Sequence, residues 1–314
     1  MKRMLILTGF MFLFSAVCAA DELIPQPPDL SEIYQLVNQP AGDCNAADSY
    51  QKAEEMLRND ENLVKDGYLD ENSEPYKLVL QGIECGRCVF PYSLDMKLPP
   101  YEQMIPMMKL YRSAAKTFAR KGQEALEKKD YATAEKWFAK AVILGLQFWE
   151  EPGITIIQDL ITMSILTEGV EGFGDLFIAK GDGPKAVACA RYLAEKTAYN
   201  DALRDFVKNK LRNGDAWPPQ ATETFKEIAR LYPTLKYLPI KVEILLRTAE
   251  INAFDETQEA KEICRKVIEE GKRDADARIR KMAEWAESLP KDSAVELIKS
   301  LGGEVPKEPP TSQK

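Results

Sequence analysis

The segment 118–145, FARKGQEALEKKDYATAEKWFAKAVILG, constrains the fold most, because it contains two helix-forming runs separated by a short polar break. Small and aromatic residues recur with helical spacing over Ala115–Ala125, and again over Ala134–Gly145. Asp130 stands where its side chain would cap the second helix. Two amphipathic helices joined by so short a turn must pack antiparallel, so the segment predicts a helical hairpin.

Six residues of this hairpin follow a known repeat pattern: Gly122, Ala125, Tyr131, Ala134, Phe138 and Ala141. In this respect the hairpin resembles the tetratricopeptide repeat (TPR), a helix pair of about 34 residues. A second copy lies over 174–196 and a third, less complete copy over 255–272. The equivalent alanines, Ala134, Ala186 and Ala260, are 52 and 74 residues apart, so the copies are divergent and extra helices must lie between them.

The resemblance implies an all-α fold, with an irregular TPR-like stack of antiparallel helix pairs (an α-solenoid) over residues 113–301. Residues 43–112 read as a separate N-terminal helical region with a CxxC loop. The β-branched run over 153–166 has the length of a helix and lacks strand-like alternation, so we interpret it as a buried helix. Residues 302–314 lack apolar periodicity and predict a disordered tail.

Residues 1–20 are typical of a secretory signal peptide, with cleavage expected near Ala20. Lys2 and Arg3 precede an apolar run over 5–17, and small residues follow it. That run is too short for the roughly 20 residues that cross a bilayer, and no other segment is apolar enough, so we expect no transmembrane span. We therefore expect a secreted or periplasmic protein.

The N-terminal sequence supports two further expectations, one about a lipid anchor and one about a linker. A lipid anchor at Cys18 is not expected, because Val17 occupies the position where a bacterial lipoprotein signal has a small residue. Residues 21–42 are rich in proline and predict a linker with one short helix.

The composition excludes several kinds of active site. The chain has no histidine, which removes histidine bases, Ser/His and Cys/His nucleophile pairs and imidazole metal ligands. Its formal net charge of −8, without a block of Lys and Arg, is unfavourable for binding nucleic acid. We therefore expect a protein without cofactor or metal that is not an enzyme.

Three cysteines, Cys44, Cys85 and Cys88, form the sharpest chemical feature. In an oxidising compartment we expect a structural disulfide among them. Metal binding or thiol–disulfide exchange at the CxxC motif, Cys85–Cys88, is the alternative. A thioredoxin-like site needs a preceding strand and a helix opening at the first cysteine, and zinc needs four ligands; neither pattern is present. Cys189 and Cys264 lie on apolar helix faces and predict buried thiols.

Four aromatic residues beside loops are candidates for contacts with a partner: Trp149, Trp217, Tyr92 and Tyr101. The same positions also suit residues that cap the core between stacked hairpins. The sequence thus favours an exported TPR-like scaffold or adaptor that binds a protein partner without catalysis. The alternative function is that of a redox or metal-binding protein that uses Cys85 and Cys88.

Overall fold

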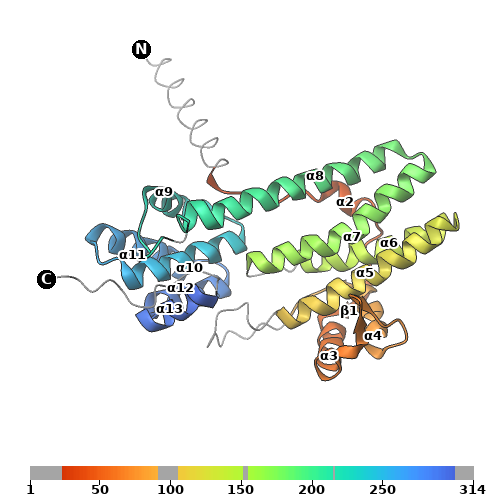
Figure 1. Ribbon diagram of the computed structural model, residues 1–314, viewed down its shortest axis with the longest axis horizontal. Coiled ribbons are helices and arrows are strands. Elements are labelled where there is room, and N and C mark those ends of the chain that lie inside the picture. Colours follow the sequence, from red (N-terminus) through yellow and green to blue (C-terminus); the bar gives the residue numbers. More distant parts are fainter. Residues whose placement is uncertain (1–22, 91–104, 151–154, 215, 301–314) are drawn as a thin grey trace, which may run out of the picture. The chain divides into compact units, whose positions relative to one another are not determined.

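The computed structural model describes residues 23–90, 105–150, 155–214 and 216–300 (Figure 1). Within these ranges the chain forms twelve α-helices, and its all-α class is as predicted. The expected signal peptide and the tail over 302–314 lie outside the described residues. In chain order the helices are α2 (Ser31–Tyr34), α3 (Ala46–Asn59), α4 (Glu74–Ile83), α5 (Ile105–Glu127), α6 (Tyr131–Glu150), α7 (Ile156–Lys180), α8 (Gly183–Asp205), α9 (Glu223–Leu231), α10 (Leu238–Phe254), α11 (Gln258–Lys272), α12 (Ala277–Ser288) and α13 (Lys291–Ser300).

The chain divides into two compact units. Unit 2 comprises residues 28–198, and unit 1 comprises residues 1–27 together with 199–314. The division falls within α8, and α5 is continuous across residue 112, where the sequence suggested a change of region.

The predicted hairpin over 118–145 is present in unit 2 as α5 and α6, which pack against each other. Lys129 adopts a left-handed conformation (φ 60°) in the connecting turn. The Asp130 carboxylate accepts a hydrogen bond of 3.1 Å from the backbone N–H of Thr133, so the predicted cap is confirmed. The third helix, α7, packs on both α5 and α6.

The β-branched run is helical from Ile156 onward, as the sequence analysis inferred. A capping box begins α7: the Thr155 hydroxyl accepts from the backbone of Gln158, whose side chain accepts from the backbone of Thr155. The helix ends at Gly181, which has φ 73° in the left-handed region that favours glycine.

A phenylalanine ring fixes how closely three of these helices approach. Phe138 of α6 is 1% exposed. A Cβ atom on Gly122 of α5 would lie 2.4 Å from this ring, and a Cβ atom on Gly172 of α7 would lie 2.2 Å from it. Since no side chain fits at either position, the two glycines allow the ring to fill the space between the backbones of α5 and α7.

Short strands accompany the N-terminal helices α3 and α4. The pair β1 (Gly42–Asn45) and β4 (Cys85–Arg87) is parallel, and the pair β2 (Val64–Lys65) and β3 (Tyr68–Leu69) is antiparallel. These strands are too short to alter the all-α class. The region expected as a linker contains α2, and Leu30, Ile33 and Val37 are buried in the apolar core of unit 2.

In unit 1, α10 packs against α11, α12 and α13. Most of α10 is buried, including charged residues. The Glu250 carboxylate forms ion pairs of 2.8 Å with Arg247 and with Arg212, which follows a π-helical turn, η2 (Phe206–Leu211). These three side chains are at most 8% exposed, so one buried carboxylate serves as the counter-charge of two buried guanidinium groups.

Candidate functional site

A groove between α5 and α7 in unit 2 is the candidate functional site. It has a volume of about 520 Å³. The two helices that border the groove, α5 and α7, are the first helices of the two helix pairs that the sequence predicted. Its lining residues are Tyr68, Lys116, Ala119, Arg120, Gln123, Phe138, Glu168, Glu171, Gly172 and Asp175.

Cationic side chains from α5 form one wall of the groove. The Arg120 guanidinium lies 4.8 Å from the centre of the Tyr68 ring and forms an ion pair of 2.5 Å with Glu71, so this cation is already engaged. Lys116 lies one turn earlier on α5 and forms no ion pair with any described residue. Lys116 is thus the cation of this wall that remains available to a ligand.

Carboxylates from α7 form the opposite wall. Glu168, Glu171 and Asp175 are spaced three and four residues apart, which places them on one face of the helix. Glu171 and Asp175 are exposed, whereas Glu168 is half-buried. Burial raises the pKa of Glu168 above its ordinary value; Glu171 acts in the same direction, and Lys116 and Arg112 oppose it.

The floor of the groove is the Phe138 ring, which lies between the two glycines and is 1% exposed. Above this apolar floor, the two charged walls face each other without an ion pair between them in the part of the chain that the structure describes. Charges that are held apart by packing can be satisfied by groups of a bound chain. The arrangement therefore suits a segment that carries basic groups, or both signs of charge, beside an apolar residue.

The three N-terminal cysteines lie elsewhere in unit 2. Cys44 and Cys85 form a disulfide that joins β1 to β4, with their Cα atoms 5.0 Å apart. The bond closes a loop with a sequence separation of 41, which corresponds to about 4 kcal/mol in the chain-entropy model. The expected disulfide is thus present, and it connects the strand before α3 to the strand after α4.

Cys88 is outside this disulfide, and its thiol is buried. The backbone is extended from Cys85 to Arg87 in β4, and the Asn45 side chain then makes two hydrogen bonds of 2.8 Å with the Val89 backbone. Three extended residues span about 10 Å, whereas a disulfide needs Cα atoms within about 7 Å. A Cys85–Cys88 bridge would therefore require the backbone to move. Among the described residues, no group of His, Cys, Asp and Glu is arranged to hold a metal ion.

The other two thiols are buried, as the sequence predicted. Cys189 is 1% exposed and Cys264 is fully buried. Burial raises the pKa of the Cys189 thiol to about 11 and that of the Cys264 thiol to about 12. Both side chains are packed as small apolar groups.

The aromatic candidates do not line the groove. Trp149 is partly buried against the apolar core of unit 2. Trp217, in unit 1, is partly buried, and its ring centre lies 4.9 Å from that of Phe254 in an edge-to-face contact. Tyr92 and Tyr101 lie outside the described residues. The groove residues were not singled out from the sequence, although Glu168, Glu171 and Asp175 share one helix face.

Comparisons with other proteins give no family assignment. No protein-family model matches the chain, and no curated protein and no solved structure matches it. Within the described residues, no helix is both long and apolar enough to cross a membrane.

Proposed function

We propose that this protein is an exported, secreted or periplasmic adaptor with TPR-like helix pairs, and that it binds a segment of a partner protein without catalysis. The observation that carries the proposal is the α5–α7 groove. Lys116 and three carboxylates face each other across the Phe138 floor and are not paired with one another. Helix-pair repeat proteins hold peptides and protein domains on surfaces of this kind.

The charge of the groove indicates the chemistry of the partner. Glu168, Glu171 and Asp175 outnumber the one cation, Lys116, that no described residue pairs with. A segment with Lys or Arg side chains would approach the α7 wall favourably, and an acidic group beside them would meet Lys116. We therefore expect a basic or mixed-charge segment with an apolar side chain for the floor.

The test is site-specific crosslinking in intact cells, with a photoreactive residue in place of Gln123 at the rim of the groove. The variant Glu171→Lys/Asp175→Lys reverses the α7 wall, and we expect it to reduce the crosslinked product at least ten-fold. The matched control Glu195→Lys/Asp201→Lys makes the same change of charge at exposed positions of α8 and should leave the product unchanged. A product that survives reversal of the wall would contradict the proposal.

Thiol–disulfide exchange at Cys85 and Cys88 receives less support, because the backbone between them is extended and Cys85 is already bonded to Cys44. An insulin-reduction assay separates the two functions. The adaptor proposal expects no turnover, whereas sustained turnover that is lost in Cys88→Ser would favour the exchange reaction.

A further inference from the structure

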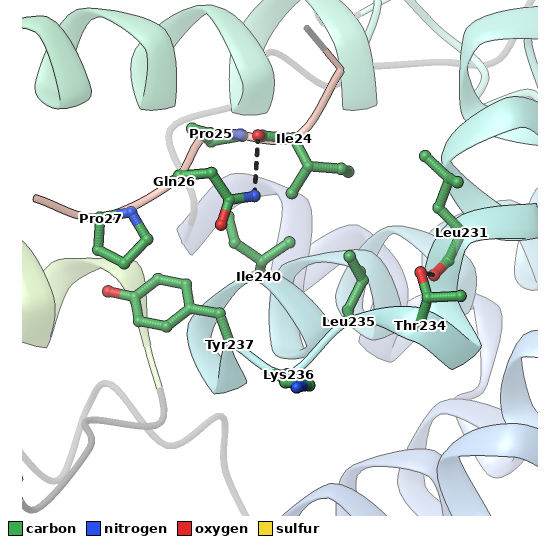
Figure 2. A pocket seen from close by; sticks show the side chains of 10 residues that line it. All are labelled: Ile24, Pro25, Gln26, Pro27, Leu231, Thr234, Leu235, Lys236, Tyr237 and Ile240. Atoms are coloured by element: carbon green, nitrogen blue, oxygen red, sulfur yellow. Dashed lines mark hydrogen bonds between the residues drawn. The ribbon is translucent and has the colours of Figure 1, made fainter. Parts of the chain in front are cut away.

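Unit 1 contains a second pocket, which lies beside the start of the described chain. Its volume is about 450 Å³. One side is formed by residues 24–27, with the sequence Ile-Pro-Gln-Pro, and the other by the turn between α9 and α10 (Figure 2). That turn includes the 3-10 helix η3 (Tyr232–Thr234). This side is lined by Leu231 at the end of α9, by Ile240 in the first turn of α10, and by the connecting residues Thr234, Leu235, Lys236 and Tyr237.

Residues 24–27 are seated on this surface by their side chains. Ile24 is only 3% exposed and Pro25 is buried, although the segment forms no strand. The Gln26 side-chain amide donates a local, long hydrogen bond of 3.4 Å to the Ile24 carbonyl, as Figure 2 shows. Pro25 and Pro27 have no N–H to donate. A segment held in this way can leave the surface without breaking a backbone ladder.

The pairing of a proline-containing segment with an aromatic surface is itself a recognition mode. In Figure 2, Pro27 lies on the side of the pocket next to the Tyr237 ring, while Ile24 lies on the side of Leu235 and Ile240. Aromatic and aliphatic grooves bind such segments because proline restricts the free chain, so little conformational freedom is lost on binding. The surface Leu231–Ile240 therefore has the chemistry of a receptor for Pro-x-Pro segments, and residues 24–27 show one seated.

The chain's own segment leaves much of the pocket unfilled. The volume of about 450 Å³ remains with Ile24 already in place. A partner segment with a larger apolar residue before the first proline would bury more surface against Leu235 and Ile240. This difference would let a partner compete with residues 24–27, which have the advantage of being attached to the receptor.

We propose that the surface Leu231–Ile240 binds a partner segment of the form bulky apolar residue–Pro–x–Pro, and that residues 24–27 of this chain occupy it until the partner displaces them. The pocket belongs to unit 1, so this inference does not rest on the α5–α7 groove of unit 2. It gives the protein a second surface with a different specificity, for proline and apolar side chains instead of charge.

The test uses the chain over residues 21–314 and a fluorescent peptide with the sequence of residues 21–30, DELIPQPPDL. Ile24→Ser in the protein weakens the internal segment, and we expect the peptide to bind this variant at least ten-fold more tightly than wild type. Ile24→Val is the matched control and should bind the peptide as wild type does. Adding Tyr237→Ala to the Ile24→Ser chain should abolish binding.

Two altered peptides test the chemistry of the segment on the Ile24→Ser chain. The peptide with all three prolines replaced by alanine should bind at least ten-fold more weakly. The peptide with phenylalanine in place of isoleucine should bind at least three-fold more tightly, because it fills the empty volume. Equal affinity for the proline and alanine peptides, or no gain in the Ile24→Ser chain, would overturn the proposal.

A measurement on the wild-type chain covers the case in which Ile24→Ser alters folding. In hydrogen–deuterium exchange, excess phenylalanine-containing peptide should raise exchange at residues 23–28 while residues 231–240 stay protected. Unchanged exchange at both segments would contradict displacement. Concentration-dependent dimerisation of wild type that Tyr237→Ala removes would assign the surface to a second copy of this chain, and would also overturn the proposal.

Discussion

The two units bury their helices in different ways. In unit 2, α5, α6 and α7 approach closely around the Phe138 ring, with Gly122 and Gly172 leaving room for it. In unit 1, α10 carries Glu243, Arg247 and Glu250 into the interior. There Glu250 forms ion pairs with both Arg247 and Arg212. The first interface depends on shape, and the second depends on balanced charge. Mutations and pH should therefore affect them differently.

The largest expected effect is the loss of the central carboxylate in unit 1. Glu250→Ala would leave Arg212 and Arg247 buried without their counter-charge, which should lower the free energy of unfolding of unit 1 by about 3–5 kcal/mol. Native-state hydrogen exchange of α10 measures this change. As a control, Glu287→Ala removes one partner of the exposed pair with Lys272 and should change stability by less than about 1 kcal/mol. Equal effects of the two substitutions would show that the buried ion pairs contribute no more to stability than an exposed pair does.

The second prediction concerns pH. Burial raises the pKa of Glu243 to about 7 in the folded chain, Glu250 acts in the same direction, and Arg212 opposes it. The folded state then holds this proton more tightly than the unfolded state, whose Glu has a pKa near 4.5. The contribution of this group is fully present below pH 4.5 and is lost as the pH rises through 7.

At about 1.4 kcal/mol per pH unit, this loss amounts to about 3 kcal/mol for unit 1. Glu243→Gln removes the titrating group, so the difference in stability between wild type and variant should change with pH over this window. Urea denaturation at pH 5 and pH 8, read from exchange of α10, gives that difference. Parallel stability curves for the two chains would contradict the assignment.

The third and smallest effect tests the interface that depends on shape. Gly172→Ala places a methyl group against the Phe138 ring and should destabilise unit 2 by about 1–3 kcal/mol. Gly174→Ala is a matched control on the same helix, because its Cβ would lie 3.6 Å from the nearest atom; it should stabilise α7 by about 0.5–1 kcal/mol. Thermal unfolding of both variants decides the sign of each change.

A second substitution checks the cause of the Gly172→Ala effect. Phe138→Leu in the Gly172→Ala chain replaces the ring with a smaller side chain, and it should restore part of the lost stability. If the double variant is less stable than the sum of the single effects predicts, the contact between Gly172 and Phe138 is not what limits the approach of α5 and α7.

Local patterns in the sequence predicted local structure well. The hairpin, the Asp130 cap and the buried Cys189 and Cys264 were all predicted, because each depends on helical spacing or on neighbouring residues. The groove was not predicted. Its walls come from α5 and α7, and the distance between those helices depends on how Phe138 packs, which spacing along one helix does not reveal.

Other features depended on contacts between distant parts of the chain. Leu30, Ile33 and Val37 lie in the proline-rich stretch expected to be a linker with one short helix, and their burial depends on contacts with distant residues. The short pairing of β1 with β4 joins segments about 40 residues apart that have no alternating pattern, so only the cysteines within them indicated proximity. The same limit applies to Glu243 and Glu250, since a single charged residue on an apolar helix does not reveal its partner.

The Phe138 ring also determines what the groove can select. Held between two backbones, it prevents α5 and α7 from moving closer together, so the opening has a minimum width that a ligand cannot reduce. A ligand too narrow to touch both walls makes contacts with only one of them. A wider ligand contacts both walls without any rearrangement of the protein. Under the proposed function, the groove would select partner segments by their width as well as by their charge.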